Sequence, residues 1–264
     1  LFRSRWAATA GSPAPGGSIH HVEDYWKDTG VGKMIFKKID NFVTISEFTK
    51  NQLISNGVDD EKIFVNYNGI GEDFYPDKNS NFEYNNYILY VGSEAKRKNL
   101  ETLIKAFKFC TEKHANLKLI KIGPSFFKEQ ETKNNELVKE LNLDNNIVFI
   151  RDFVSYDKLR QFYSNAICYV SVSKLEGFGL TVPEALACDC PVVASKIPVF
   201  EEILGSSQIL VNPNNPQEIA NGIIKYIENK DFRKQMIIEG KNIADKFKWN
   251  KNVKNIIKFL NQQF

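Results

Sequence analysis

The sequence predicts an α/β fold, built as a Rossmann-like, doubly wound parallel sheet. From residue 87 onward, short apolar runs alternate with segments that have the period of a helix. Strands that alternate with helices in this way are typical of β-α-β units around a parallel sheet. The apolar runs are short and continuous, as expected of buried strands.

The elements expected in this region follow from that alternation. Strands are expected at 87–92, 117–123, 147–150, 167–173, 191–195 and 208–212. Helices are expected at 99–114, about 131–141, 156–166 and about 181–188, and the chain after residue 212 is expected to be helical to its end. In the first of these helices, Leu100, Leu103, Ile104 and Phe107 recur on one face.

The chain before this region differs from it. Residues 1–18 are rich in Ala, Gly, Ser, Pro and Arg but lack Lys, Asn and Ile, so we interpret them as a vector-derived leader or a flexible linker. Residues 19–71 contain a strand ("NFVTIS"), a helix that begins at Ser46 and stops at Gly57, and a second strand ("KIFVNYN"). This is too little to close a sheet, and we interpret it as the end of another α/β domain, with 72–248 as the main domain and 249–264 as a final helix.

The amino-acid composition argues against two classes of protein, those that bind nucleic acid and those that span a membrane. The 264 residues carry a net charge of +3, with 25% charged and 42% hydrophobic residues, which is ordinary for a soluble globular protein. That charge fits an enzyme of phosphorylated small molecules or proximity to an anionic membrane, but it is too small to predict nucleic-acid binding. No apolar run approaches the roughly 18 residues of a membrane-spanning helix.

The four cysteines predict no metal site. Cys110 and Cys168 lie in apolar segments, where cysteine behaves as a small buried hydrophobe. Cys188 and Cys190 form a CxC, but no second Cys or His cluster completes a set of four ligands. A reducing, cytoplasmic setting is therefore expected.

The stretch "KLEGFGLTVPEALACDCPVVAS" (174–195) is a strand-to-helix turn with a glutamate pair, Glu176 and Glu184. Ligands of open parallel sheets bind at such turns, at the carboxyl ends of strands. Gly177 and Gly179 allow the backbone to approach a ligand closely. The N–H groups that open the helix lack intrahelical acceptors, so an anion such as phosphate is favoured there.

A structural interpretation of the same stretch stays open. Thr181 to Glu184 fits the T-x-x-E pattern of a capping box, with Pro183 in the first helical turn. In that case Glu184 serves only a backbone N–H. Glu176 directly follows an apolar strand, where a carboxylate is expected to gain little without a ligand.

A basic loop follows the first strand of the main domain. "YVGSEAKRKNLETLI" places Lys96, Arg97 and Lys98 between that strand and a helix. The alternative is a solvated basic loop, as most short charge runs are. Both motifs are expected at the carboxyl edge of the sheet, where they can hold a diphosphate from two sides. No GxGxxG follows a strand, which argues against dinucleotide redox chemistry.

At these motifs the sequence resembles the retaining GT-B glycosyltransferases of family 4, also called glycosyl transferases group 1. "SKLEGFGLTVPEALACDCPVVAS" resembles the family's E-x7-E signature, and "VGSEAKRKNLETLIKAF" resembles its phosphate loop. "VTISEFTKNQLISNGVDDEKIFVNYNGI" resembles the end of its N-terminal domain and the interdomain hinge. The resemblance runs from about Ile39 to the C-terminus and implies that much of an N-terminal domain is missing from the chain.

The resemblance implies roles at a nucleotide-sugar donor site. Lys98, with Arg97, would balance charge on the leaving diphosphate, and Glu176 would bind sugar hydroxyls near the reacting carbon. Glu184 would hydrogen-bond the ribose, and the CxC would be a packing turn. The wider donor-binding set, which includes backbone N–H groups of the glycine-rich turn and a nucleobase contact in "RDFV" (151–154), is Gly92, Ser93, Phe153, Gly177, Phe178, Gly179, Leu180, Thr181 and Glu184. Many members have Arg in place of Ser93.

The implied activity is transfer of a sugar from a UDP- or GDP-sugar to a glycan or lipid-linked acceptor, with retention of configuration and with no metal or other cofactor. Expected partners are a missing N-terminal domain or subunit and a peripheral contact with the cytoplasmic membrane face, and this chain by itself is expected to bind donor even if it transfers no sugar. In the family the final helix crosses onto the N-terminal domain. Because much of that domain is missing, the apolar face of the helix is expected to be partly exposed.

Two alternative functions stay open. One is a nucleotide-sugar-binding module that acts with a separate acceptor subunit, and the other is a GT-B sugar-nucleotide epimerase.

Overall fold

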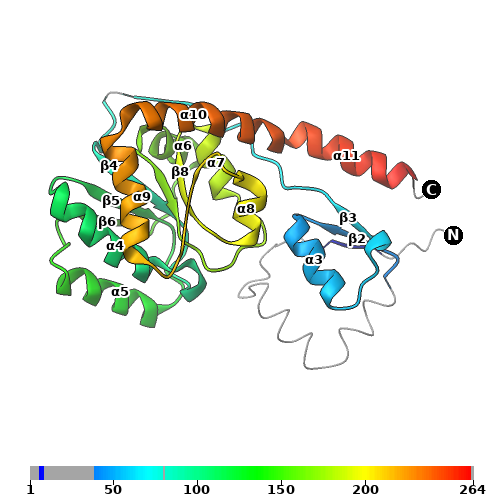
Figure 1. Ribbon diagram of the computed structural model, residues 1–264, viewed down its shortest axis with the longest axis horizontal. Coiled ribbons are helices and arrows are strands. Elements are labelled where there is room, and N and C mark those ends of the chain that lie inside the picture. The colour runs from blue at the N-terminus through cyan, green and yellow to red at the C-terminus, as the bar shows by residue number, and fades with distance from the viewer. Residues whose placement is uncertain (1–5, 9–38, 80, 263–264) are drawn as a thin grey trace. The chain divides into compact units, whose positions relative to one another are not determined.

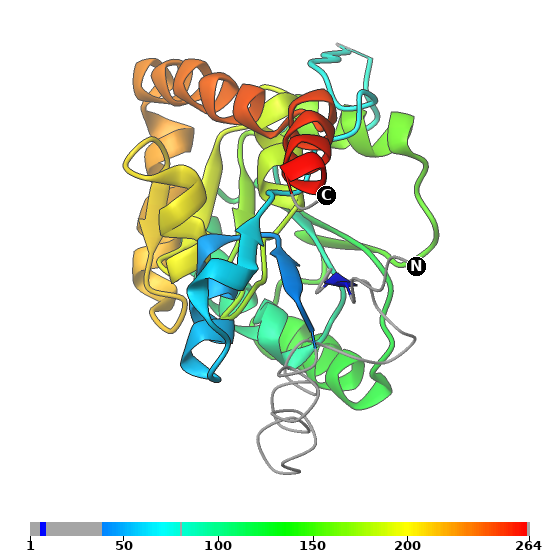
Figure 2. The same cartoon turned by 90° about the vertical axis from the view of Figure 1, so that its right-hand side faces the viewer.

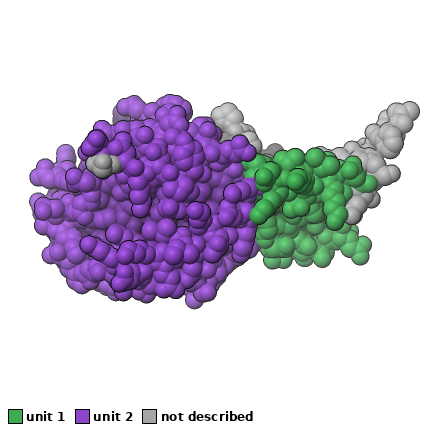
Figure 3. Space-filling view, turned by 90° about the horizontal axis from the view of Figure 1, so that it is seen from above, with its two compact units in different colours: residues 1–69, 249–264 green, residues 70–248 purple. Residues whose placement is uncertain are grey.

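The computed structural model describes residues 6–8, 39–79 and 81–262, and it forms two compact units that are coloured separately in Figure 3. The first unit comprises residues up to Gly69 together with those from Trp249, and the second comprises Ile70–Lys248. Of the predicted leader 1–18, only Trp6–Ala8 is described, and 19–38 lie outside the described residues. What these two segments are therefore stays a prediction.

The second unit is built on a sheet of six strands in the order β6-β5-β4-β7-β8-β9, and every neighbouring pair is parallel. The strands are β4 (Tyr87–Val91), β5 (Lys118–Ile122), β6 (Ile147–Ile150), β7 (Tyr169–Ser171), β8 (Val192–Ser195) and β9 (Ile209–Val211). Each predicted strand is present, with ends within two residues of the expected range. The prediction of a doubly wound parallel sheet is confirmed.

Helices flank both faces of this sheet (Figures 1 and 2). They are α4 (Leu100–Lys113), α5 (Lys128–Glu140), α6 (Tyr156–Asn165), α7 (Thr181–Ala187), α8 (Pro198–Leu204), α9 (Pro216–Glu228) and α10 (Lys230–Ala244). Helix α4 packs against α5 and α9, whereas α7 packs against α6 and α10. Helix α8 was not among the expected helices, and it begins with a proline at its first position.

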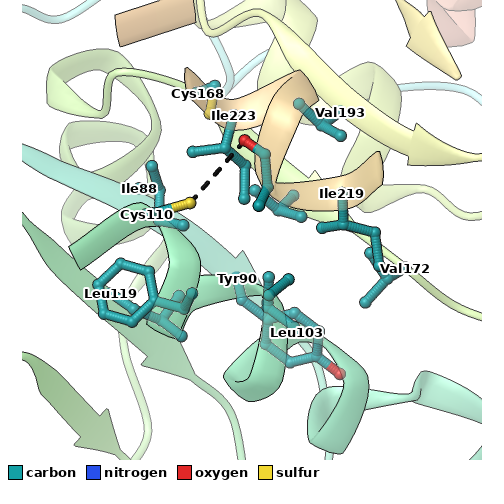
Figure 4. Packing of buried hydrophobic residues seen from close by; sticks show 14 of the residues in the cluster. Ile88, Tyr90, Leu103, Cys110, Leu119, Cys168, Val172, Val193, Ile219 and Ile223 are labelled. Atoms are coloured by element: carbon teal, nitrogen blue, oxygen red, sulfur yellow. Dashed lines mark hydrogen bonds between the residues drawn. The ribbon is translucent and has the colours of Figure 1, made fainter. Parts of the chain in front are cut away.

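The main core lies between the sheet and the α4–α9 side (Figure 4). Consecutive strand residues point to opposite faces of a sheet, so Ile88 and Tyr90 of β4 enter this core while Tyr87 and Leu89 face the other way. All four are buried, because helices cover both faces. Cys110 and Cys168 lie fully buried in the same core, which confirms their predicted role as packing residues.

The first unit is smaller. Its parallel strands β1 (Trp6–Ala8), β2 (Asn41–Thr44) and β3 (Ile63–Val65) form a sheet in that order, with α3 (Glu47–Ser55) between the last two strands in sequence. Ser46 caps α3, since its hydroxyl accepts a hydrogen bond from the N–H of Thr49. The predicted strand-helix-strand order and the start at Ser46 are confirmed.

The final helix, α11 (Trp249–Gln262), has one side attached to this unit. Asn252 donates to the carbonyl of Tyr67 at 2.7 Å, and the ring of Phe259 stacks on Phe64 with centroids 4.2 Å apart. Trp249, Val253 and Ile257, by contrast, are 47%, 45% and 50% exposed, in agreement with the expected partial exposure. No helix among the described residues has the length and apolar character needed to cross a membrane.

The carboxyl ends of β4 and β5 approach each other closely at two glycines. Gly123 has a φ of +129°, and a Cβ there would lie 2.7 Å from the carbonyl oxygen of Gly92. We expect Gly123→Ala to lower the free energy of unfolding by more than about 2 kcal/mol, because backbone strain and a backbone clash add. Urea denaturation measures this loss.

Gly71→Ala is the matched control, since its Cβ would meet nothing closer than 3.7 Å. We expect that substitution to be nearly neutral. Equal losses in the two variants would show that the close approach of β4 and β5 is not a constraint.

Candidate functional site

The two predicted motifs lie at the same edge of the sheet, on either side of its switch point. After β4 the chain builds outward through β5 and β6, and it then returns to place β7 on the other side of β4. The loops that leave the carboxyl ends of β4 and β7 therefore diverge, and in open α/β sheets ligands bind in the crevice at this point. The basic loop follows β4 and the glycine-rich turn follows β7.

Glu176 joins the two motifs. Its carboxylate, only 8% exposed, lies 2.5 Å from Lys98 Nζ through Oε1 and 3.3 Å from Arg97 Nη1 through Oε2. The backbone N–H of Lys174 donates to the carbonyl of Arg97 at 2.8 Å, which ties the loops together directly. The structure thus brings the three predicted catalytic residues together.

One expectation about Glu176 is wrong. We expected a carboxylate at this place to gain little in the absence of a ligand, but two charged hydrogen bonds stabilise it. Lys98 and Arg97 are 18% and 33% exposed, so an anion from solvent can reach them. A diphosphate can replace the carboxylate as their partner, and the oxygens of Glu176 are then able to accept hydrogen bonds from hydroxyl groups.

The glycine-rich turn offers further donors. Gly179 has a φ of +79°, and a Cβ there would lie 2.5 Å from the ring of Phe200, so only glycine fits. Phe178 is buried and packs edge-on against Phe247, with centroids 5.4 Å apart. Within the described part of the chain, the N–H groups of Gly179, Leu180 and Thr181 have no acceptor.

The capping-box interpretation of Thr181 and Glu184 is wrong. The residue at the N-cap of α7 is Leu180, in helical conformation, and no side chain caps the helix. The hydroxyl of Thr181 instead accepts a 2.8 Å hydrogen bond from Tyr169. Glu184 accepts from the hydroxyl of Tyr163 at 3.4 Å, so its carboxylate serves no backbone N–H at the start of the helix.

Glu184 is half-buried and electrostatically unsatisfied. Burial raises the pKa of its carboxyl group to about 7, and the hydrogen bond from Tyr163 opposes this rise only in part. No cation pairs with Glu184 among the residues that the structure describes. The two glutamates of the motif thus differ: Glu176 has two cationic partners, whereas Glu184 has spare capacity to accept hydrogen bonds.

The remaining predicted residues surround this centre less closely. The N–H of Gly92 donates to the carbonyl of Ile122 at 2.8 Å, and the carbonyl of Ser93 accepts from the hydroxyl of Tyr90 at 3.3 Å. These hydrogen bonds hold the start of the basic loop, directly after β4. Phe153 follows the edge strand β6 and is 92% exposed. No contact joins it to Glu176 or to Glu184 in the described structure, and its role stays a prediction.

Sequence reasoning missed two sets of buried polar contacts beside the basic loop. Glu94 and Lys121 are completely buried, with Nζ 3.1 Å from Oε1. The hydrogen bond from Asn134 and the charge of Lys121 hold the pKa of Glu94 below its ordinary value, although burial opposes them. The second set is that of Asn99, which is buried in the left-handed conformation, with a φ of 60°, and donates to the carbonyls of Val172 and Pro213. A lysine in the middle of an apolar strand, "KLIKI", was the available signal.

No metal-ligand cluster is found in the described ranges: no three His, Cys, Asp or Glu side chains are grouped so that they can hold an ion. Cys188 and Cys190 are buried free thiols. Burial raises the pKa of Cys188 to about 12, so this thiol stays protonated at neutral pH.

A comparison with models of known protein families identifies the family of this chain. The family model described as "Glycosyl transferases group 1" matches residues 72–243. The chain belongs to this family. An uncharacterized glycosyltransferase of Methanocaldococcus jannaschii is 33% identical over 242 residues, which cover 87% of this chain and 60% of that protein. The O-antigen chain mannosyltransferase RfbU of Salmonella typhimurium is 32% identical over 216 residues, or 78% and 59% of the two chains.

A solved structure supports the same assignment of the fold. HepE of Anabaena, in complex with UDP and glucose, matches with a TM-score of 0.77 and 22% identity, over 85% of this chain and 64% of HepE. The α/β unit of this family member is thus of the GT-B type. The chain spans about 60% of the length of the two curated relatives that it matches.

The raised pKa of Glu184 gives a test of its burial. The folded protein holds this proton more tightly than the unfolded chain, so Glu184 contributes most stability below its ordinary pKa of 4.5 and loses it as the pH rises to about 7. We expect wild type to lose about 2 kcal/mol relative to Glu184→Gln between pH 4.5 and 8. Denaturation of both proteins across this range measures the difference, and a constant difference would contradict the assignment.

Proposed function

We propose that this chain binds a nucleotide-diphosphate sugar at the carboxyl edge of β4 and β7, as the donor-binding part of a retaining GT-B glycosyltransferase of family 4. The observation that carries the proposal is the convergence of Glu176, Arg97 and Lys98 from the two loops at the switch point. Two cations and a carboxylate at one edge of the sheet suit a ligand that presents both a diphosphate and hydroxyl groups.

The diphosphate is bound by Lys98 and Arg97 on one side and by the N–H groups of Gly179 and Leu180 on the other. These groups come from different loops. Among the described residues, the side chains of Lys98 and Arg97 contact the carboxylate of Glu176, and Arg97 also donates to the carbonyl of Leu175 at 3.4 Å. Gly177 and Gly179 keep the turn free of side chains beside the ligand. The N–H group of Thr181, which has no acceptor among the described residues, contacts the sugar.

Glu184 holds the ribose in this proposal. A carboxylate with one long hydrogen bond and no cation gains most from the paired hydroxyl groups of a ribose. Phe153 offers an exposed aromatic face to the nucleobase from the loop after β6. The nucleotide is UDP or GDP; support for a uridine donor is that HepE was solved with UDP and glucose.

The proposed reaction is a displacement at the anomeric carbon with net retention. The bond from that carbon to the diphosphate oxygen breaks, and its electron pair leaves with the diphosphate. The acceptor hydroxyl bonds to the same face of the carbon and gives its proton to the departing diphosphate. Lys98 and Arg97 stabilise the charge that develops there, in place of a metal ion.

The whole protein transfers the sugar to a glycan or lipid-linked acceptor in this proposal, and a further domain or subunit provides the acceptor site. A cytoplasmic location with peripheral membrane contact is part of it. A separate binding module and a sugar-nucleotide epimerase are not favoured, since the matching family and both relatives are named as glycosyltransferases.

A thermal-shift panel with UDP, GDP, ADP and CMP tests the donor site. A nucleotide at about 100 times its dissociation constant stabilises a protein by about 2.7 kcal/mol, which raises the melting temperature by several degrees. We expect a rise with UDP or GDP in wild type and a much smaller rise in Lys98→Met. No rise with any nucleotide, or the same rise in both proteins, would refute the proposal.

The ribose role of Glu184 has a separate test. We expect Glu184→Gln to bind UDP or GDP at least about tenfold more weakly, because each lost charged hydrogen bond contributes about 1.5–3 kcal/mol. The 2′-deoxy nucleotide is the matched control: it lacks one of the hydroxyls, so the substitution should weaken its binding less. Calorimetric titration at pH 8 keeps Glu184 ionised. Equal losses for both nucleotides would place the ribose elsewhere.

A further inference from the structure

The loop that carries Arg97 and Lys98 is held at both ends. At its far end, Asn99 donates through Nδ2 to the carbonyls of Val172 at 3.0 Å and Pro213 at 2.7 Å. Between the ends, the cations lie in a short 3₁₀ turn, η2 (Lys96–Lys98), in which the N–H of Lys98 donates to the carbonyl of Ala95 at 2.9 Å. The position of the turn is therefore tied to the residues that hold its two ends.

Glu94 is the anchor at the near end. Its carboxylate is completely buried, and Oε1 lies 3.1 Å from Lys121 Nζ and 3.0 Å from Arg151 Nε. Its Oε2 accepts from Asn134 at 2.9 Å. These partners come from β5, from the end of β6 and from α5, so a single side chain of the basic loop is tied to three other elements of the unit.

The charges of this cluster are matched. Lys121 is buried and also donates to the carbonyl of Gly123 at 2.6 Å, while Arg151 has a second carboxylate, Glu131, at 3.3 Å. A buried carboxylate is tolerated only when its partners are in place, since an unpaired charge is strongly disfavoured. The cluster thus admits one position of Glu94 and disfavours positions in which the loop has shifted.

We infer that Glu94 is a positioning residue, which holds the η2 turn where Lys98 and Arg97 meet Glu176 and the donor diphosphate. Its side chain is fully enclosed, so it acts through the loop and contacts no ligand. The inference rests on the proposed donor site. A shift of about 1 Å in such a loop can cost up to about 100-fold in function.

The competing explanation is that the cluster contributes only stability. The two explanations differ in the affinity that a nucleotide gains from its second phosphate. Lys98 and Arg97 bind the diphosphate in the proposed site, so this gain falls if Glu94 positions them and stays the same if Glu94 contributes only stability. The readout is the ratio of the dissociation constants of UMP and UDP, with GMP and GDP measured in the same way. A purely structural role lowers the melting temperature but leaves the ratio of the folded protein unchanged.

Two variants are compared with wild type by calorimetric titration. Glu94→Gln keeps the shape of the side chain but removes its charge. Glu94→Gln/Lys121→Met also removes the lysine charge, so it leaves no fully buried ion unpaired and stays foldable, since Arg151 keeps Glu131. We expect the ratio to fall about tenfold in both variants.

The controls make each outcome decisive. Lys98→Met should lower the ratio, whereas Arg160→Gln should lower only the melting temperature, because Arg160 is a buried ion-paired residue on α6 bonded to Asp77 and Asp157. If wild type and Lys98→Met differ but both Glu94 variants keep the wild-type ratio, the positioning role is overturned while the donor site stands. A wild-type chain that binds the diphosphates no better than the monophosphates overturns the proposed function, and this inference with it.

Discussion

Strands β4 and β7 lie next to each other in the sheet, and the candidate site depends on that pairing. The N–H of Leu89 donates to Cys168 at 3.0 Å, and the N–H of Ile167 donates to Tyr87 at 2.9 Å. Because parallel neighbours end at the same edge, the loops that follow them must meet there, with one turning toward each face of the sheet. Without this contact the basic loop and the glycine-rich turn would share no crevice.

The two glutamates of the glycine-rich motif have opposite electrostatic environments, although seven residues separate them. Glu176 lies three residues before Gly179, which has a positive φ, and its carboxylate is paired with two cations of the loop that follows β4. Glu184 lies one turn into α7, beside Tyr163, where burial raises its pKa to about 7. In the free protein the carboxylate of Glu176 is therefore paired with two cations, whereas the carboxylate of Glu184 is partly buried and has no cationic partner among the described residues.

The sequence predicts what depends on local pattern and on strand order. Continuous apolar runs identify the strands, and residues that follow two strands of a parallel sheet are expected at one edge, which is why Glu176, Arg97 and Lys98 were grouped correctly. Helix α8 was missed because its seven residues contain too few turns to display a period and no motif marks its start, whereas the equally short α7 was located from the glycine-rich motif that precedes it. The Glu94 cluster was missed for another reason: its partners approach only across the sheet, and no local spacing reveals which buried charges neutralise one another.

The pairing of β4 with β7 also bears on how the protein forms during synthesis. Lys98 and Glu176 are 78 positions apart, so β4, α4 and β5 are complete long before β7 emerges. Until then one edge of β4, an apolar central strand, has no partner and is open to wrong association. We expect the closing of that edge to be the slow step in folding, since long-range parallel pairing must overcome the entropy of a large loop. The crevice therefore comes into existence only at this late stage, and a nascent chain that stalls before β7 would display the basic loop with nothing opposite it.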